Sequence, residues 1–135
     1  MPHPDMVPLI ITDDLPTTRA FYVDELGCAV TVEQDNYLQV RFGESDGAPE
    51  LAFLPPQPAD SPLGRQDPFA GGLVVSIAVH DADKHRSWLT ERGVDAPEAT
   101  DKPWGWRSLV LRDPNGVTLD FFHEIADTAA QDASS

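Results

Sequence analysis

Two tryptophans separated by one glycine are the residues of this sequence best suited to hold a small molecule. Trp104 and Trp106 lie in the segment 102–107, Lys-Pro-Trp-Gly-Trp-Arg, at the entrance to a predicted strand. An indole ring at the mouth of a cavity can stack on a planar ligand, and its face attracts cations. The alternative is that both rings fill the core or a dimer interface, and the sequence does not choose between the two.

A second group of candidate binding residues follows from strand alternation. In the predicted strand 36–43, Leu38 and Val40 are expected to pack under a helix, so that their neighbours face a cavity. Arg41 then either pairs with Glu50 or Asp120 or holds an anionic group of a ligand. The residues that strand alternation turns toward the cavity are therefore Tyr37, Gln39 and Arg41.

An internal repeat positions these residues. Segments 13–27 and 81–93 each read as a helix that begins at an aspartate cap and ends at a glycine. The strand 50–54 resembles 118–122, and the two halves match at offsets of 66 to 68 residues. The other expected strands are 7–11, 28–34 and 36–43 in the first half, and 73–80, 94–96, 107–112 and 117–123 in the second.

Each half therefore reads as strand, helix and three further strands, which predicts an α+β fold. We expect two tandem βαβββ modules that form a curved mixed sheet around a cavity, with the helices outside. Residues 1–124 form one domain, with module one at about 6–54 and module two at about 73–124. The Pro- and Gly-rich segment 55–72 is the linker, and 125–135 is expected to be a disordered tail.

This pattern resembles the vicinal oxygen chelate superfamily, which includes glyoxalases, bleomycin-resistance proteins and dioxygenases. The resemblance is carried by Phe21-Tyr22 six residues before Gly27, and by the hairpin Asp113-Pro114-Asn115-Gly116 with its following strand. It covers about residues 6–124 and is closest to the drug-binding branch that uses no metal. The family hosts many chemistries on one scaffold, so the resemblance does not by itself settle the function.

Metal-dependent members of that family place one His or Glu ligand on each of four strands. A divalent metal needs several such donors within about 2.0–2.6 Å. The four histidines of this chain lie too far along a strand, on the other face or on a helix to replace them. We therefore expect no metal and no cofactor. The four aligned positions are Val7, Ala52, Val74 and Asp120. The resemblance thereby implies that Asp120 and Phe122 face the cavity, as do their counterparts in the first half, Glu50 and Ala52.

Composition narrows the partners and the location. The net charge of −14 over 135 residues argues against nucleic acid and anionic membranes. It suits a cationic ligand, or it simply keeps the surface soluble. No window is apolar for the roughly 18 residues that span a bilayer, and the chain shows no signal-peptide pattern. With a single cysteine, Cys28, no intrachain disulfide can form, so we expect a cytoplasmic protein.

Together these features predict a metal-free protein that binds an antibiotic-like small molecule, planar or cationic. The family resemblance implies a homodimer and a role in antibiotic resistance. An enzyme of the same superfamily remains open: a lyase, isomerase or dioxygenase with a degenerate metal site, in which Asp120 or Glu50 acts as general base. A third possibility is a ligand-sensing module.

Overall fold

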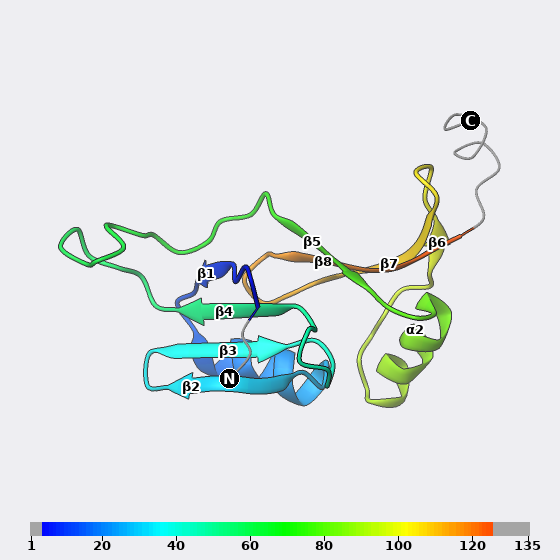
Figure 1. Cartoon of the computed structure of the whole chain (residues 1–135), viewed down its shortest axis with the longest axis horizontal. Coiled ribbons are helices and arrows are strands. Elements are labelled where there is room, and N and C mark those ends of the chain that lie inside the picture. Colours follow the sequence, from blue (N-terminus) through cyan, green and yellow to red (C-terminus); the bar gives the residue numbers. More distant parts are fainter. Residues whose placement is uncertain (1–3, 126–135) are drawn as a thin grey trace. The chain divides into compact units, whose positions relative to one another are not determined.

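The computed structural model describes residues 4–125, which divide into two compact units. The first unit contains residues up to Gly72 together with Asp113–Gly116, and the second contains 73–112 and 117–125. Each unit is a four-stranded mixed sheet with helical structure against it (Figure 1). The predicted α+β class with two modules is confirmed. All but the first residue of the expected tail lies outside the described residues.

The first unit has the strand order β1-β4-β3-β2. Its strands are β1 (Leu9–Ile11), β2 (Ala29–Gln34), β3 (Tyr37–Arg41) and β4 (Glu50–Leu54). β1 runs parallel to β4, and the remaining pairs are antiparallel. Val40 and Phe53 are buried on the helix side, where the Tyr22 ring lies 4.8 Å from the Phe53 ring. The alternation predicted for the strand 36–43 is therefore correct.

The helical segment of the first unit changes its winding part-way. It begins as α1 (Leu15–Arg19), capped by the Asp14 carboxyl, which accepts a hydrogen bond from the Thr17 N–H at 3.0 Å. It continues as the π-helical η1 (Ala20–Glu25), in which the Leu26 N–H bonds the Phe21 carbonyl five residues back. The sequence predicted one regular helix, because over six residues a hydrophobic pattern does not separate 3.6-residue turns from wider ones.

The second unit repeats the arrangement with the strand order β5-β8-β7-β6. β5 runs parallel to β8, and Asp81 caps α2 by accepting from the N–H groups of Asp83 and Lys84. The second-unit elements are β5 (Val74–Ala78), α2 (Ala82–Glu91), β6 (Thr100–Asp101), β7 (Trp106–Arg112) and β8 (Thr118–Glu124).

The strand expected at 94–96 is wrong. That segment is irregular. The strand that pairs with β7 on the side away from β8 is the later β6, Thr100–Asp101. Val94 and Ala96 are nevertheless buried, and the Ala96 carbonyl accepts from Arg86 Nε at 3.1 Å. The apolar pattern therefore marked burial of an irregular segment and not strand pairing.

The predicted hairpin at Asp113–Gly116 is present between β7 and β8, and its tip belongs to the first unit. The buried Asp113 carboxyl accepts a 2.6 Å hydrogen bond from the Tyr22 hydroxyl. Asn115 Oδ1 accepts from the Thr12 hydroxyl at 2.7 Å, and its amide donates to Thr18. Gly116 turns with a φ of 90°, which residues with a side chain rarely adopt.

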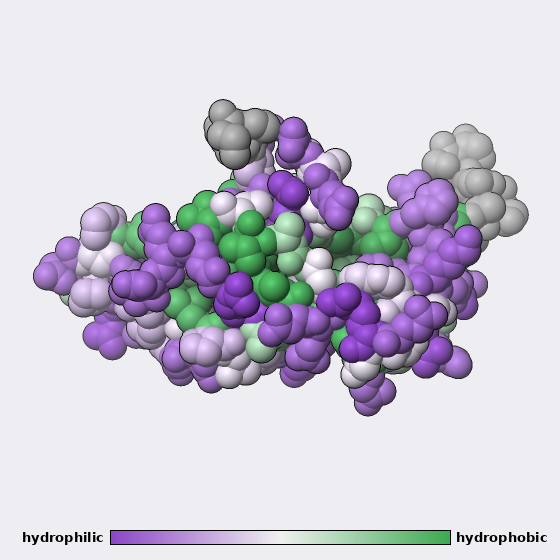
Figure 2. Space-filling view, turned by 90° about the horizontal axis from the view of Figure 1, so that it is seen from below, coloured by the Kyte–Doolittle hydropathy of each residue, from purple (hydrophilic) through white to green (hydrophobic). Residues whose placement is uncertain are grey.

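Polar groups dominate the surface seen in Figure 2, in which hydrophobic residues form smaller areas between hydrophilic ones. This fits the net charge of −14. Within residues 4–125, no helix has the length and apolar character needed to cross a membrane.

Candidate ligand-binding site

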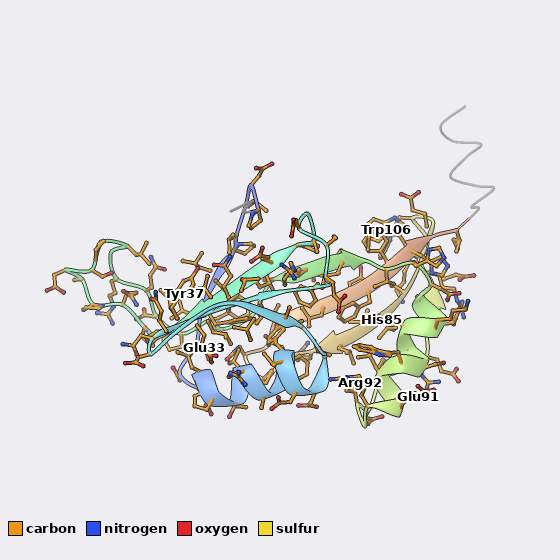
Figure 3. The ribbon with its side chains drawn as sticks, turned by 60° about the horizontal axis from the view of Figure 1, so that its bottom comes forward. Glu33, Tyr37, His85, Glu91, Arg92 and Trp106 are labelled. Carbon is orange, nitrogen blue, oxygen red and sulfur yellow. The ribbon has the colours of Figure 1, made fainter. Side chains whose placement is uncertain are left out.

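The open face of each sheet is the side turned away from that unit's own helix, and it carries most of the candidate residues. In the second unit, α2 packs on one side, where the His85 ring lies 4.7 Å from the Phe121 ring. Strand alternation puts Trp106, Asp120 and Phe122 on the other side. Figure 3 shows His85 and Trp106 on opposite sides of this sheet.

Trp106 and Phe122 form a stacked aromatic pair on this open face. Their ring centroids are 3.6 Å apart and their planes differ by 12°. Trp104 lies in the turn before β7 and is 59% exposed. The two tryptophans singled out in the sequence thus differ: Trp106 is fixed in the sheet against an aromatic partner, whereas Trp104 stands in solvent.

Next to the aromatic pair, two buried polar atoms have no hydrogen-bond partner. Asp120 is 6% exposed, and its Oδ2 accepts from the Ser76 hydroxyl at 2.9 Å, but its Oδ1 has no partner among residues 4–125. The hydroxyl of the fully buried Ser108 also has none. Ser108 lies directly across from Phe122 and diagonally from Asp120. An unsatisfied buried polar group costs about 1–3 kcal/mol, so a pair of them calls for an explanation.

The open face of the first unit carries a connected polar network. The Tyr37 hydroxyl donates to Gln39 Oε1 at 2.6 Å, and Gln39 Nε2 donates to Glu50 Oε1 at 2.8 Å. The Thr31 hydroxyl donates to the same Glu50 oxygen at 2.7 Å. Partial burial, with the nearby Glu50 charge, raises the pKa of Tyr37. The fully buried Ala52 pairs with Gln39 across the strands.

Arg41 is not held by a carboxylate. Its Nε donates to the Gly43 carbonyl at 2.8 Å, and no ion pair to Arg41 occurs within residues 4–125. Of the alternatives that the sequence left open for Arg41, the pairing with Glu50 is therefore not seen within the described part of the first unit, and the contact with an anionic ligand group stays a prediction.

Comparison with known proteins decides the family. The family model described as "Glyoxalase/Bleomycin resistance protein/Dioxygenase superfamily" matches residues 4–121. This chain belongs to the glyoxalase/bleomycin resistance protein/dioxygenase superfamily. No curated protein sequence matches it significantly.

Solved structures share the superfamily fold with this chain at low sequence identity. A bleomycin-binding protein complexed with bleomycin has a TM-score of 0.65 at 19% identity, with 89% of this chain and 98% of that chain covered. An antibiotic binding protein from Streptomyces sp. CB03234 has 0.63 at 24%, covering 87% and 93%. A lactoylglutathione lyase from Agrobacterium tumefaciens has 0.66 at 19%, covering 87% and 90%. At these identities the likeness concerns the fold.

The residues at the superfamily's metal-ligand positions do not fit a divalent metal ion. In the structure, Ala52 pairs with Leu9 and Asp120 pairs with Ser76. These two strand partners lie two residues beyond the aligned positions Val7 and Val74, but on the same face of each sheet. Apart from the Asp120 carboxyl, none of the residues at these positions is a usual metal donor. Within the described part of the chain, no three His, Cys, Asp or Glu side chains gather to hold a metal.

Sequence reasoning missed Ser76 and Ser108. Serine occurs in strands and turns alike and therefore carries little pattern signal. The continuous pairing of β7 with β8 puts Ser108 on the same face of the sheet as Trp106. A search for hydroxyl residues two positions from the aromatic candidates would have found it.

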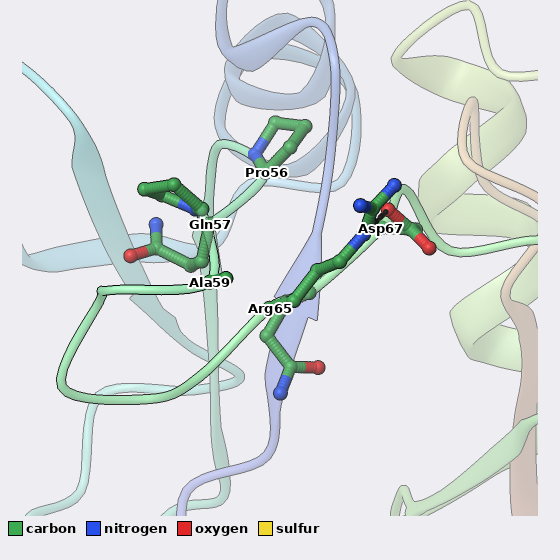
Figure 4. Close-up of a pocket in the computed structure, with 7 residues that line it drawn as sticks. Pro56, Gln57, Ala59, Arg65 and Asp67 are labelled. Carbon is green, nitrogen blue, oxygen red and sulfur yellow. Dashed lines mark hydrogen bonds and ion pairs between the residues drawn. The ribbon is translucent and has the colours of Figure 1, made fainter.

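Other features are weaker candidates. The linker folds back through backbone hydrogen bonds between Gln57 and Gln66 and encloses an open hollow of about 440 Å³ (Figure 4). Its Arg65–Asp67 ion pair is largely exposed, so nothing there is desolvated. Burial raises the pKa of the Cys28 thiol to about 12, which keeps it protonated and a poor nucleophile at neutral pH.

Proposed function

We propose that this protein binds a planar, antibiotic-like small molecule on the open face of its second unit, without a metal ion. The observation that carries the proposal is the Trp106–Phe122 stack beside a buried, half-unpartnered Asp120. The proposed ligand-binding residues of this unit are Trp104, Trp106, Asp120 and Phe122, and the first unit's candidates, Tyr37, Gln39, Arg41, Glu50 and Ala52, stay a prediction from the sequence.

Three physical arguments support this function. Aromatic stacking is worth about 0.5–1.5 kcal/mol beyond the area that it buries, so a preformed aromatic pair favours a flat ligand. A net charge of −14 attracts cations over a distance and raises their encounter rate. Proteins described as bleomycin-binding and antibiotic binding share this fold, which makes antibiotic sequestration, and hence antibiotic resistance, the leading biological role.

The proposal includes a cytoplasmic homodimer. The superfamily resemblance supports dimerisation, and the lone, buried Cys28 suits a reducing compartment. Light scattering coupled to size exclusion should give twice the chain mass of 14.8 kDa. A mass that stays at one chain at concentrations well above those of the binding assay would remove the dimer from the proposal.

The direct test is calorimetric titration of the full chain, stripped with EDTA, with metal-free bleomycin. We expect saturable binding of one molecule per chain with a dissociation constant of about 1 μM or below. Addition of Ni²⁺, Zn²⁺, Mn²⁺ or Fe²⁺ before the titration should leave no stoichiometric metal on the protein. Absence of binding would overturn the bleomycin-type assignment, and one tightly held metal per chain would overturn the metal-free part.

One observation favours an enzyme as the second candidate. The free Oδ1 of buried Asp120 could accept a proton from a bound substrate, as a lyase or isomerase of this superfamily requires of its base. Recovery of the titrated compound separates the two functions. A binding or ligand-sensing protein returns the molecule unchanged, whereas an enzyme returns a product whose formation is lost in Asp120→Asn.

A further inference from the structure

The open face of the second unit carries a polar group with a defined orientation. Ser76 donates to Asp120 Oδ2 at 2.9 Å and so fixes the rotation of the carboxyl group, which leaves Oδ1 as the free oxygen. Ser108 Oγ, buried and also free, lies on the neighbouring strand of the same face. Phe122, the cross-strand neighbour of Ser108, carries the Trp106 stack.

We infer that Asp120 and Ser108 form a socket for a nitrogen group that donates hydrogen bonds, such as an amidine, at the edge of a flat aromatic ligand. The inference rests on the proposed function and names the ligand class for the same site. A carboxylate oxygen only accepts hydrogen bonds, and a serine oxygen accepts as well as donates. Once the side chains that bury the two atoms move aside, a group with two N–H bonds at one edge can therefore satisfy both of them while its ring contacts Trp106 or Phe122.

The surrounding charges favour the same class of ligand. Arg107 precedes Ser108 in the chain, but it lies on the helix side of the sheet, where Asp83 and Asp101 each bind it at 2.8 Å. It is therefore not available to neutralise Asp120 from the open face. A cationic amidine would supply the missing charge, whereas a carboxylate or phosphate would be repelled.

Two probes of the same shape test the inference: naphthalene-2-carboxamidine, and 2-acetylnaphthalene, which lacks N–H donors. Calorimetry on the full native chain should give at least about tenfold tighter binding of the amidine. Asp120→Asn puts an amide donor where the free oxygen was, so its preference should reverse toward the ketone. Ser108→Ala should weaken amidine binding about threefold and leave the ketone unchanged.

Glu91→Gln is the matched control, because Glu91 is exposed on α2 and its loss changes the net charge by the same amount. It should keep the native preference for the amidine. Equal binding of the two probes by the native chain overturns the inference. This comparison uses the native chain alone, so its result stands even if a variant fails to fold. Equal losses in Asp120→Asn and Glu91→Gln also overturn it, since long-range charge would then explain the preference.

Bleomycin binding separates failure of this inference from failure of the proposed function. If bleomycin binds but the amidine has no advantage, the socket is wrong and the binding function stands. If bleomycin and both probes all fail to bind, the socket and the proposed function fall together.

Discussion

The two sheets of this protein treat their buried carboxyl groups differently. In the first unit, Glu50 accepts from Thr31 and Gln39, and Asp113 accepts from Tyr22. In the second, Asp120 is satisfied on one oxygen, and both unpartnered buried side-chain atoms found within residues 4–125 belong to this unit. The first unit therefore satisfies its buried carboxyl groups within the fold, and we propose that the second keeps an acceptor for a ligand.

The largest expected loss of stability concerns Asp113, a buried carboxyl group that accepts a hydrogen bond within the first unit. Tyr22→Phe removes the 2.6 Å hydrogen bond that the Tyr22 hydroxyl donates to the buried Asp113 carboxyl. We expect the free energy of unfolding in urea to fall by about 2–3 kcal/mol. Tyr37→Phe, the matched control, loses a bond to the neutral Gln39 at a less buried site and should cost about 1 kcal/mol or less. Equal losses of unfolding free energy in the two variants would contradict the expected difference.

A smaller loss is expected within the Glu50 network. Thr31→Val keeps the shape of the side chain and removes one of the two donors to Glu50 Oε1. Urea unfolding should show destabilisation of about 1–2 kcal/mol. An unchanged unfolding midpoint would mean that the network is not structural.

Ser108→Ala tests the second unit, in which buried polar atoms lack hydrogen-bond partners within residues 4–125. The serine hydroxyl is buried without a partner among residues 4–125, so its removal deletes an unsatisfied group and breaks no hydrogen bond between these residues. We expect stability to stay within about 0.5 kcal/mol or to rise. A loss as large as that of Thr31→Val would show that Ser108 has a structural partner and would remove the contrast between the units.

The smallest effect concerns pH. Burial lowers the pKa of His85 in the folded protein, so the unfolded chain, with an ordinary value near about 6.5, takes up the proton first. His85 therefore lowers the free energy of unfolding as the pH drops below about 6.5. This contribution ends once the pH falls below the pKa of His85 in the folded protein. Urea midpoints at several pH values in this window should fall less steeply in His85→Phe, which keeps a ring against Phe121. His80→Gln, at an exposed site, is the control, and parallel slopes for the native chain and His85→Phe would refute the assignment.

Local features of the fold were predictable from the sequence, and features that depend on strand pairing were not. Asp14 and Asp81 cap their helices because the side chains act on their own segments, and the alternation around Val40 shows its buried face directly. The register that places Asp120 opposite Ser76 depends on the pairing of two residues 44 positions apart in the chain. No local sequence pattern encodes that register. The unpartnered state of Ser108 emerges only when its whole surroundings are known.

The central claim is that the open face of the second unit binds the ligand. The most direct measurement is an NMR titration of the isotope-labelled full chain with metal-free bleomycin. We expect the largest shifts at the Trp106 indole N–H and at the backbone amides of Ser108, Asp120 and Phe122, with little change in the linker around Gln57. Saturable shifts confined to that linker or to α2, with none at Trp106, would contradict it.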